Sequence, residues 1–470
     1  MSAIKERIFF VMMILYMPAG YTQVCNCVEN YEALNKMIKA DYPGYLDKTR
    51  NKMFLGFYDS LHRQIEAEKN IYQCYLKLSA YINFFKDRHL SFGMNANAEM
   101  NRQIADVFSN IKNEITPLSD DTFSDIIKGT WELNTGSYYR IKISGSVDKG
   151  YTGIILKADN LYWFPGQLKV FIRKSDVPNQ YTAKYFIRDH SSTNIDISVI
   201  NSNLIDFGSN GLWQRVGDSS QNSEIKRITK QRQQVVVRRI NDNALYIRIP
   251  SFDIQYYEAV KKVVDSLKQV QMTSNLVLDV RDNNGGSKFV SNLLLDYVYT
   301  KPIKMPGYSV KTSERNIRDL EGLISNSEIN TKFDTSELRK DILEYKKYPD
   351  SLYPSSADYE IKMDSIYTLP NKVFILINRF SASATELFLL QALQSHKVIL
   401  VGENTRGAID YVDVGSPHAL PCEIFFYRTP RTRSNRVDTV PIDGIGISPT
   451  IKIPSGFDAL LSVEKLLGND

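Results

Sequence analysis

Residues 372–388 read KVFILINRFSASATELF, and this stretch decides the fold of the second half of the chain. The apolar run from Val373 to Ile377 predicts a buried strand, and the small residues after it lead directly into a helical pattern. Such a junction holds a serine hydroxyl at a helix N-terminus, where free N–H groups and the helix dipole favour negative charge. Ser383 is therefore a candidate nucleophile. Ser383 and Glu386 also have the spacing of a capping box, which needs no chemistry.

Strands and helices alternate through the rest of the region that we assign to the core, residues 235–470. Strands are predicted at 245–249, 276–280, 373–377 and 398–401, and helices at 256–270 and 384–396. This rhythm is typical of an α/β fold with a mainly parallel sheet covered by helices. A polar, charged segment at about 306–367 interrupts it, and we expect a helical insertion or a flap near the site.

Three regions separate this core from the start of the chain. Residues 24–119 have the spacing of apolar side chains that predicts helices, and residues 120–218 have short alternating segments that predict a small antiparallel β barrel or sandwich. Trp131, Trp163 and Trp213 all lie in this β-rich domain and are expected in its core. The polar stretch 219–234 is the predicted linker.

The N-terminus predicts export. Residues 1–23 combine a basic start with an apolar segment too short to span a bilayer, as in a secretory signal peptide; a membrane anchor or a buried helix is the alternative. The expected location is secreted, periplasmic or in the cell envelope, with membrane contact only through this segment. Export permits disulfides among Cys25, Cys27, Cys74 and Cys422, and a bridge from Cys25 or Cys27 to the helix that carries Cys74 is one interpretation; buried free thiols are the alternative, and the sequence does not determine the connectivity. A formal charge of +5 among 470 residues is too balanced to indicate nucleic-acid binding.

Four separated segments together resemble the motifs of the C-terminal (tail-specific) processing peptidases, a family of serine peptidases. They are the strand and turn at 276–286 (D-x-R-x-N-x-G-G), the nucleophile segment at 381–386 (S-A-S-A-x-E), the turn at 401–407 (V-G-x-x-T-x-G) and the closing segment at 442–449, which resembles E-G-x-G-V-x-P. The four occur in family order, and this makes the resemblance specific. It implies a crotonase-like α/β catalytic core with Ser383 as the nucleophile.

The predicted base follows from a departure within this resemblance. Ala408 stands where one branch of the family carries a lysine base, and no lysine occurs between residues 398 and 451. The chain instead resembles the tricorn-core branch, whose base is a histidine in a D-x-H setting, and residues 87–89 (DRH) match that segment. His89 is therefore the predicted base, because histidine takes and returns a proton near neutrality. His418 is the second candidate.

The base needs a carboxylate that holds its tautomer. The resemblance puts Asp443 at the position where related proteins carry glutamate. Asp410, two positions after Ala408, is the second candidate for the acid. Arg88 stands where tricorn-type proteins carry an accessory serine, so that role is not expected here.

The oxyanion hole is expected from the N–H of Ala384 and from one of Gly285 and Gly286, since glycine lets a substrate approach the backbone closely. No cluster of residues in the sequence suggests a metal site, and no cofactor is expected.

The leading interpretation is a secreted serine endopeptidase that cleaves peptide or unfolded-protein substrates near their C-termini. A catalytically inactive peptide- or ligand-binding protein on the same fold is the alternative. An acyl-CoA enzyme on the same kind of core is disfavoured by the predicted signal peptide. The retention of Ser383, His89 and the two glycines together favours an enzyme.

Overall fold

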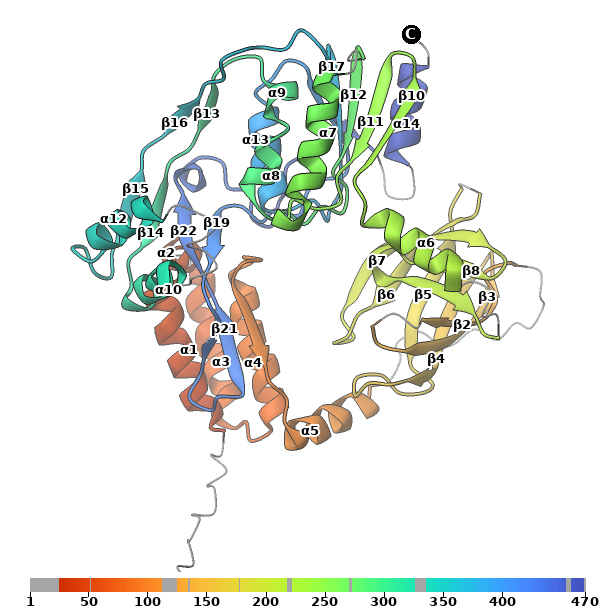
Figure 1. The fold of residues 1–470 in the computed structure, drawn as a ribbon. Helices are drawn as coiled ribbons and strands as arrows, with labels where there is room; N and C mark the ends of the chain where they lie inside the picture. Colours follow the sequence, from red (N-terminus) through yellow and green to blue (C-terminus); the bar gives the residue numbers. More distant parts are fainter. Residues whose placement is uncertain are drawn as a thin grey trace, which may run out of the picture.

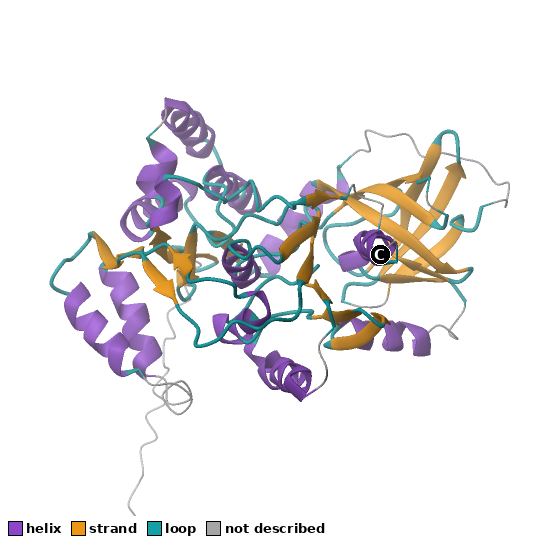
Figure 2. Cartoon of the chain, turned by 90° about the horizontal axis from the view of Figure 1, so that it is seen from above, coloured by secondary structure: helices purple, strands orange, loops and turns teal. Residues whose placement is uncertain are grey.

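A computed structural model describes residues 25–50, 52–111, 125–133, 136–176, 178–217, 222–269, 273–325, 335–453 and 458–468. The predicted signal peptide at 1–23 lies outside them. Figure 1 shows three parts: a group of N-terminal helices, a β barrel, and an α/β core formed by the second half of the chain. In the view from above, the strands of the barrel gather at one end of the molecule (Figure 2).

The core is built on one six-stranded sheet. Its strands, in spatial order, are β10 (Val236–Asn241), β11 (Ala244–Arg248), β12 (Asn275–Asp279), β17 (Lys372–Ile377), β18 (Val398–Gly402) and β23 (Ile451–Lys452). Only the edge pair β10–β11 is antiparallel, and every other pair in the sheet is parallel. The predicted α/β fold with a mainly parallel sheet is confirmed.

Helices cover both faces of this sheet, and this explains the unbroken apolar run in β17. One face packs against α7 (Tyr257–Gln269), α8 (Lys288–Asn292), α9 (Leu295–Val298) and α13 (Ala384–Ala392), and the other packs against α14 (Ala459–Leu467) (Figure 1). Val373 and Ile375 point to the first face, while Phe374 and Leu376 point to the second. Because both faces are dry, every position of the strand must be apolar. The helix predicted at 384–396 ends at Ala392.

The β-rich domain is a closed antiparallel barrel. Its strands are β2 (Gly129–Leu133), β3 (Tyr139–Ser146), β4 (Gly150–Ala158), β5 (Leu168–Lys174), β6 (Gln180–Phe186), β7 (Ser192–Asn201), β8 (Leu204–Asp206) and β9 (Leu212–Arg215). Trp131, Trp163 and Trp213 are buried in the core, as predicted. The predicted linker is largely helical, since α6 (Asn222–Arg232) occupies it, and Arg232 forms an ion pair with Asp206 of the barrel.

The N-terminal part is helical, as predicted. It comprises α1 (Cys27–Asp41), α2 (Tyr45–Thr49), α3 (Lys52–Glu66), α4 (Ile71–Phe84), the short strand β1 (Ser91–Met94) and α5 (Ala98–Ser109). Asparagine side chains cap three of these helices: the carboxamide oxygens of Asn26, Asn70 and Asn97 accept hydrogen bonds from the first turns of α1, α4 and α5.

Two disulfides anchor these helices. Cys27 joins Cys74 at the start of α4, consistent with one interpretation of the sequence, and Cys25 joins Cys422, which is 397 residues away in the sequence. The second bridge ties the N-terminal helices to the C-terminal part of the chain. The described cysteines are therefore all paired.

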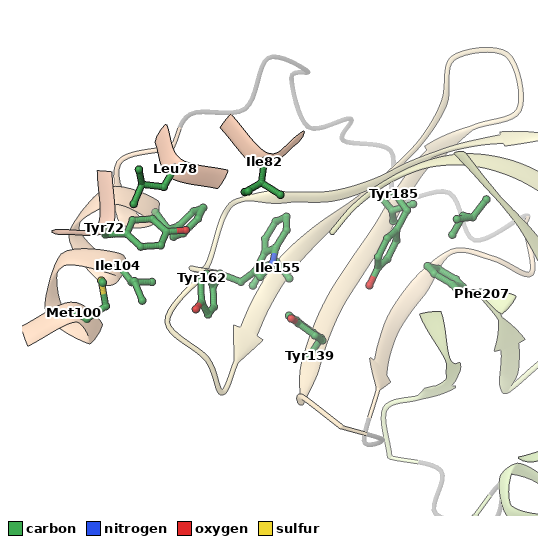
Figure 3. Close-up of a cluster of buried hydrophobic side chains, with 14 of the residues drawn as sticks. Tyr72, Leu78, Ile82, Met100, Ile104, Tyr139, Ile155, Tyr162, Tyr185 and Phe207 are labelled. Atoms are coloured by element: carbon green, nitrogen blue, oxygen red, sulfur yellow. The ribbon is translucent and has the colours of Figure 1, made fainter. Parts of the chain in front are cut away.

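A continuous apolar core connects the N-terminal helices to the barrel. Figure 3 shows side chains of α4 and α5, including Tyr72, Met100 and Ile104, on one side, and the barrel residues Tyr139 and Tyr185 further along the same cluster. Phe108 of α5 contacts the rings of Tyr72, Tyr162 and His190 and so bridges the two parts. The helices and the barrel therefore share buried surface.

The segment at 306–367 combines helices with strands. It contains β14 (Tyr308–Lys311), α10 (Glu314–Ser325), α12 (Ser336–Tyr345), β15 (Leu352–Ser356) and β16 (Tyr359–Ile361), and β16 pairs with β13 (Ile303–Met305). Its residues 326–334 lie outside the described part. A four-stranded sheet in the order β15-β14-β22-β19, with β19 (Tyr411–Val414) and β22 (Pro430–Ser434), joins this insertion to the core.

A further small sheet brings the N-terminal region against the C-terminal strands. Its order is β1-β21-β20, with β20 (His418–Ala419) and β21 (Phe425–Arg428). Short 3-10 turns lie at Gly208–Asn210, Ile254–Tyr256 and Asn435–Asp438. Among the described residues, no helix has the length and apolar character that crossing a membrane requires.

Candidate active site

Ser383 lies where the chain leaves β17 and enters α13. It is the residue immediately before the helix, its side chain is partly exposed, and its backbone has φ 56° and ψ −119°. This conformation is unfavourable for a residue with a side chain and costs on the order of 1–3 kcal/mol, so the surrounding structure must hold it. A strained turn of this kind is typical of an exposed nucleophile between a strand and a helix.

Glu386 holds the strained backbone in place. Its buried carboxylate accepts hydrogen bonds from the N–H of Ser383 at 3.0 Å and, across the site, from the Thr405 hydroxyl at 2.5 Å and the N–H groups of Gly407 and Ala408 at 2.8 Å each. The capping-box spacing seen in the sequence is therefore real. It joins the nucleophile segment to the turn at 401–407, which the capping interpretation alone did not predict.

The neighbouring Ser381 has a structural position. Its hydroxyl is fully buried, donates to the carbonyl oxygen of Val280 at 2.9 Å and accepts from the N–H of Asn378 at 3.2 Å. A hydroxyl with both bonds satisfied inside the protein has no access to a substrate. This difference identifies Ser383 as the serine of the pair that is available for chemistry.

The N–H groups of Ala384 and Gly286 are the available oxyanion donors. Within the described part of the chain, neither has a hydrogen-bond partner, whereas the N–H of Gly285 donates to the side-chain oxygen of Asn283 at 3.0 Å. Of the two glycines that the sequence offers as oxyanion donors, Gly286 is therefore the one with a free N–H. Gly285 instead allows close packing, because a Cβ there would lie 2.8 Å from the nitrogen of Ala384 and 2.9 Å from the Cβ of Ser383.

Asn283, from the D-x-R-x-N motif, fixes this turn. Besides Gly285, its side-chain oxygen accepts from the Thr385 hydroxyl at 2.9 Å, and its amide group donates to the Ile249 carbonyl at 3.1 Å. The other two motif residues pair at the strand end, where Arg281 contacts Asp279 at 2.7 Å. The motif thus supports the backbone around the candidate nucleophile.

His89 comes to the site from the end of α4. Its backbone N–H donates to the Asp87 carboxylate at 2.8 Å, which fixes the loop that presents the ring. Burial lowers the pKa of the imidazole, and the charge of Asp443, the backbone of Tyr411 and the charge of Glu386 oppose this shift. His89 therefore lies in the electrostatic field of the carboxylate that binds the N–H of Ser383.

Asp443 lies close enough to His89 for its charge to act on the imidazole. One carboxylate oxygen accepts from the N–H groups of Ile409 at 2.7 Å and Asp410 at 2.8 Å. The other oxygen, and Nδ1 of His89, are buried without a hydrogen-bond partner among the described residues. Burial and the nearby charge of Asp87 raise the pKa of Asp443 to about 7. An imidazole and a carboxylate that both lack a partner form a complementary pair.

Asp410, the runner-up acid, is fully engaged elsewhere. It forms an ion pair with Arg436 at 2.7 Å and accepts from the N–H groups of Ile442 and Asp443 at 2.9 Å each. It therefore braces the closing segment on which Asp443 sits. His418 is likewise occupied, since its ring bonds Asp319 of the insertion at 3.1 Å.

A cleft borders the segment before the nucleophile. It has a volume of about 690 Å³ and lies between the barrel, α6 and the carboxyl ends of β11, β12, β17 and β18. Phe207 and Leu212 of the barrel line one side, and the turn from Ile377 to Phe380 lines the other. The carboxyl ends of parallel strands are where α/β sheets bind ligands.

The model of peptidase family S41 matches residues 243–453, which contain the core sheet except for β10, together with the candidate nucleophile and acid. These residues form a domain of peptidase family S41. His89 lies outside the matched range, in the N-terminal helical region. The resemblance to C-terminal processing peptidases stated from the motifs is thereby confirmed.

Two solved structures share the fold over almost the whole chain, and a third is similar at a lower TM-score. Mature CPAF has a TM-score of 0.52 at 12% identity and covers 94% of this chain and 97% of its own. Mature CPAF complexed with lactacystin has a TM-score of 0.52 at 13% identity, with coverage of 95% and 99%. The photosystem II D1 C-terminal processing protease has a TM-score of 0.40 at 13% identity, with coverage of 95% and 97%. No curated protein sequence matches the chain.

Proposed function

We propose that this S41 protein is a serine endopeptidase that cleaves peptide or unfolded-protein substrates near their C-termini, with Ser383 as nucleophile, His89 as base and Asp443 as the acid that orients the base. The observation that carries the proposal is the strained, partly exposed Ser383 flanked by the unpartnered N–H groups of Ala384 and Gly286. A peptidase needs a nucleophile and two such donors at one point.

The chemistry proceeds in two halves. Oγ of Ser383 bonds to the carbonyl carbon of the substrate while its proton passes to His89, and the oxyanion accepts hydrogen bonds from Ala384 and Gly286. His89 then gives this proton to the leaving amine as the C–N bond breaks, leaving an ester on Ser383. Water, deprotonated by His89, attacks the ester, and His89 returns the proton to Oγ of Ser383 as the C–O bond breaks and the new carboxylic acid leaves. Asp443 stabilises the imidazolium that forms in both halves.

The cleft between the barrel and the sheet is the proposed place for the rest of the substrate chain. The turn 377–380 lines it and lies three residues before Ser383 in the sequence. The barrel would then help to hold the substrate. The core is proposed to be of the crotonase type, as the motifs imply.

Export from the cytoplasm is part of the proposal. The predicted signal peptide at 1–23 motivates it, and the two disulfides fit an oxidising compartment. Expression with the full N-terminus, followed by fractionation and N-terminal sequencing of the mature protein, tests it. Recovery of an uncleaved chain in the cytoplasm would contradict it.

Hydrolysis of unfolded proteins tests the proposed activity. Purified wild type and Ser383→Ala are incubated with a reduced, carboxymethylated protein, and the products are sequenced by mass spectrometry. We expect fragments with wild type only, with cuts gathered near the C-terminus. Binding without cleavage by wild type would favour the inactive binding protein, and equal cleavage by both proteins would reveal a contaminating peptidase.

A further inference from the structure

Two arginines lie beside the candidate nucleophile and have no role in the steps above. Arg88 directly precedes His89, and Arg406 follows Thr405 in the turn that Glu386 holds. The N–H of Arg406 donates to the carbonyl oxygen of Ser381 at 2.9 Å, so its backbone lies against the nucleophile segment. Both side chains are exposed to solvent.

The backbones that carry these arginines are tightly fixed. On either side of Arg406, the Thr405 hydroxyl and the Gly407 N–H both bond Glu386. Gly446 packs so closely on the same turn that a Cβ there would lie 2.1 Å from the carbonyl oxygen of Thr405. Arg88 sits between the buried Asp87 and His89, whose N–H bonds the Asp87 carboxylate. The backbone positions from which the Arg88 and Arg406 side chains extend are therefore fixed.

Neither guanidinium has a partner. Within the described ranges, neither Arg88 nor Arg406 forms a side-chain hydrogen bond or an ion pair, although the other arginines of this region do. Those pairs are Arg431 with Asp413, Arg433 with Asp47 and Arg436 with Asp410. Partial burial and then the like charge of Arg88 lower the pKa of Arg406, and the charge of Glu386 opposes this shift.

The carboxylates of this region bond other groups and neither arginine. Glu386 accepts from four backbone or hydroxyl donors, one oxygen of Asp443 accepts from two N–H groups of the loop at 409–410, and one oxygen of Asp87 accepts from the N–H of His89. The second oxygens of Asp443 and Asp87 are buried. A pair of unpartnered guanidinium groups is suited to a planar anion, which it binds through charge-assisted hydrogen bonds. Beside a peptidase nucleophile, the anion that arrives is a carboxylate of the substrate.

We propose that Arg88 and Arg406 together bind a carboxylate of the peptide substrate next to the bond that Ser383 attacks, so that the protein selects peptides with a carboxylate near the cleaved bond. The inference rests on the proposed function and names its substrate class. The carboxylate belongs either to an aspartate or glutamate side chain or to the free end of the peptide, and the experiment below distinguishes these sources.

Matched synthetic peptides test the proposal. One sequence is made with glutamate or glutamine at each of the three positions on either side of the cut, and each peptide is made with a free or an amidated C-terminus. We expect wild type to show kcat/KM about 5- to 10-fold higher for the peptide with the favoured carboxylate. The preference should shrink at high salt, since ions screen exposed charges.

The ratio between the two peptides is then measured in variants. Arg88→Gln and Arg406→Gln are each expected to reduce the ratio, and the double variant is expected to bring it to about one. Arg102→Gln, which alters an exposed arginine of α5 paired with Glu99, should keep the wild-type ratio. Because both peptides are measured on the same sample, a partly unfolded preparation does not change the ratio.

The outcomes separate this inference from the function on which it rests. A preference set by the internal glutamate or by the free end identifies the source of the carboxylate, and either supports the proposal. Cleavage of acidic and neutral peptides at equal rates, or a ratio that the double variant retains, would overturn it while leaving the peptidase intact. If wild type cleaves none of the peptides, the proposed function fails and the inference fails with it.

Discussion

The candidate nucleophile and the candidate base are held by two different kinds of structure. Ser383 lies between β17 of the parallel sheet and α13, and its N–H donates to Glu386, which also accepts from the Thr405 hydroxyl. The Thr385 hydroxyl of the same helix donates to Asn283. His89 belongs to the N-terminal helices, which reach the core through β1 and β21 and through a disulfide between residues 397 positions apart.

Long-range polar contacts complete the attachment of the base. The hydroxyl of Tyr427 donates to Asp41 at 2.7 Å, and Arg433 pairs with Asp47 at 2.6 Å, so two helices of the N-terminal region are fixed to C-terminal strands. The candidate nucleophile is thus held by the core, whereas its proposed pairing with His89 depends on how the N-terminal helices pack against the core. Changes near Ser383 in the core should therefore remove the nucleophile, and changes in the N-terminal helices should remove the base that activates it.

The largest expected effect separates the two serines. Ser383→Ala should lower kcat by at least about 10³-fold, since removing the nucleophile removes the acyl-enzyme route, while stability falls by only about 1 kcal/mol. Ser381→Ala should instead cost stability, about 1–3 kcal/mol, because it leaves buried partners at Val280 and Asn378 unsatisfied. Steady-state kinetics and thermal melting measure both. The reverse pattern would mean that Ser381 is the nucleophile.

Asparagine substitutions of Asp443 and Asp410 should also differ in whether they reduce activity or stability. Asp443→Asn is expected to lower kcat by about 10²- to 10⁴-fold, because an amide favours the wrong imidazole tautomer. The melting temperature of this variant above pH 7 should not fall below that of wild type. Burial raises the pKa of Asp443 well above its unfolded value, so ionisation of Asp443 destabilises the wild-type fold as pH rises through about 7, and asparagine does not ionise. Asp410→Asn should destabilise by about 3 kcal/mol, since it leaves Arg436 without its buried partner. Loss of turnover only in Asp410→Asn, with its stability intact, would reassign the acid.

Breaking a disulfide of the N-terminal helices tests their dependence on docking. The bridge between Cys27 and Cys74 closes a loop with a sequence separation of 47, and removing it should cost up to about 4 kcal/mol. In the variant with both cysteines changed to serine, activity should be lost at a lower urea concentration than the structure of the sheet. Coincident loss of activity and of sheet structure would show that the two regions unfold as one unit.

The smallest expected effect is a shift of the pH profile. kcat/KM should increase with pH along a curve whose midpoint lies near pH 7, because the base must be neutral and Asp443, with a pKa of about 7, must be ionised. The charge of Asp87 contributes to the raised pKa of Asp443, so Asp87→Asn should move this midpoint to lower pH. Asp242→Asn, in an exposed turn, is the control. A midpoint that stays fixed would show that Asp87 does not act on the pair.

Local sequence patterns predicted the region around Ser383 well. An apolar run with a helix after it means a buried strand and a helix N-terminus, and the structure has both within a few residues of the expected bounds. The strained backbone of Ser383 was not predictable, because the segment around it is held by contacts such as the hydrogen bond from Thr385 to Asn283, 102 positions away. The hydrogen bond from the N–H of Gly285 to Asn283 spans only two positions, but it depends on the conformation of the turn.

The base was predicted only through a family resemblance. Nothing in the periodicity of residues 71–85 places His89 near Ser383, because that depends on the pairing of β1 with β21. Long-range contacts also explain why the sequence offered Asp410 as a second candidate acid from its position in the turn. Its ion pair with Arg436 forms across 26 positions of the sequence and gives it a different role.

The most direct test of the account is covalent labelling by a fluorophosphonate probe, with the adduct located by mass spectrometry. The account predicts one adduct, on the peptide that contains Ser383, formed rapidly in wild type, at a similar rate in Ser381→Ala, and at least about 10²-fold more slowly in His89→Ala. An adduct on another residue, or labelling of His89→Ala at the wild-type rate, would contradict the pairing of a nucleophile from the sheet with a base from the N-terminal helices.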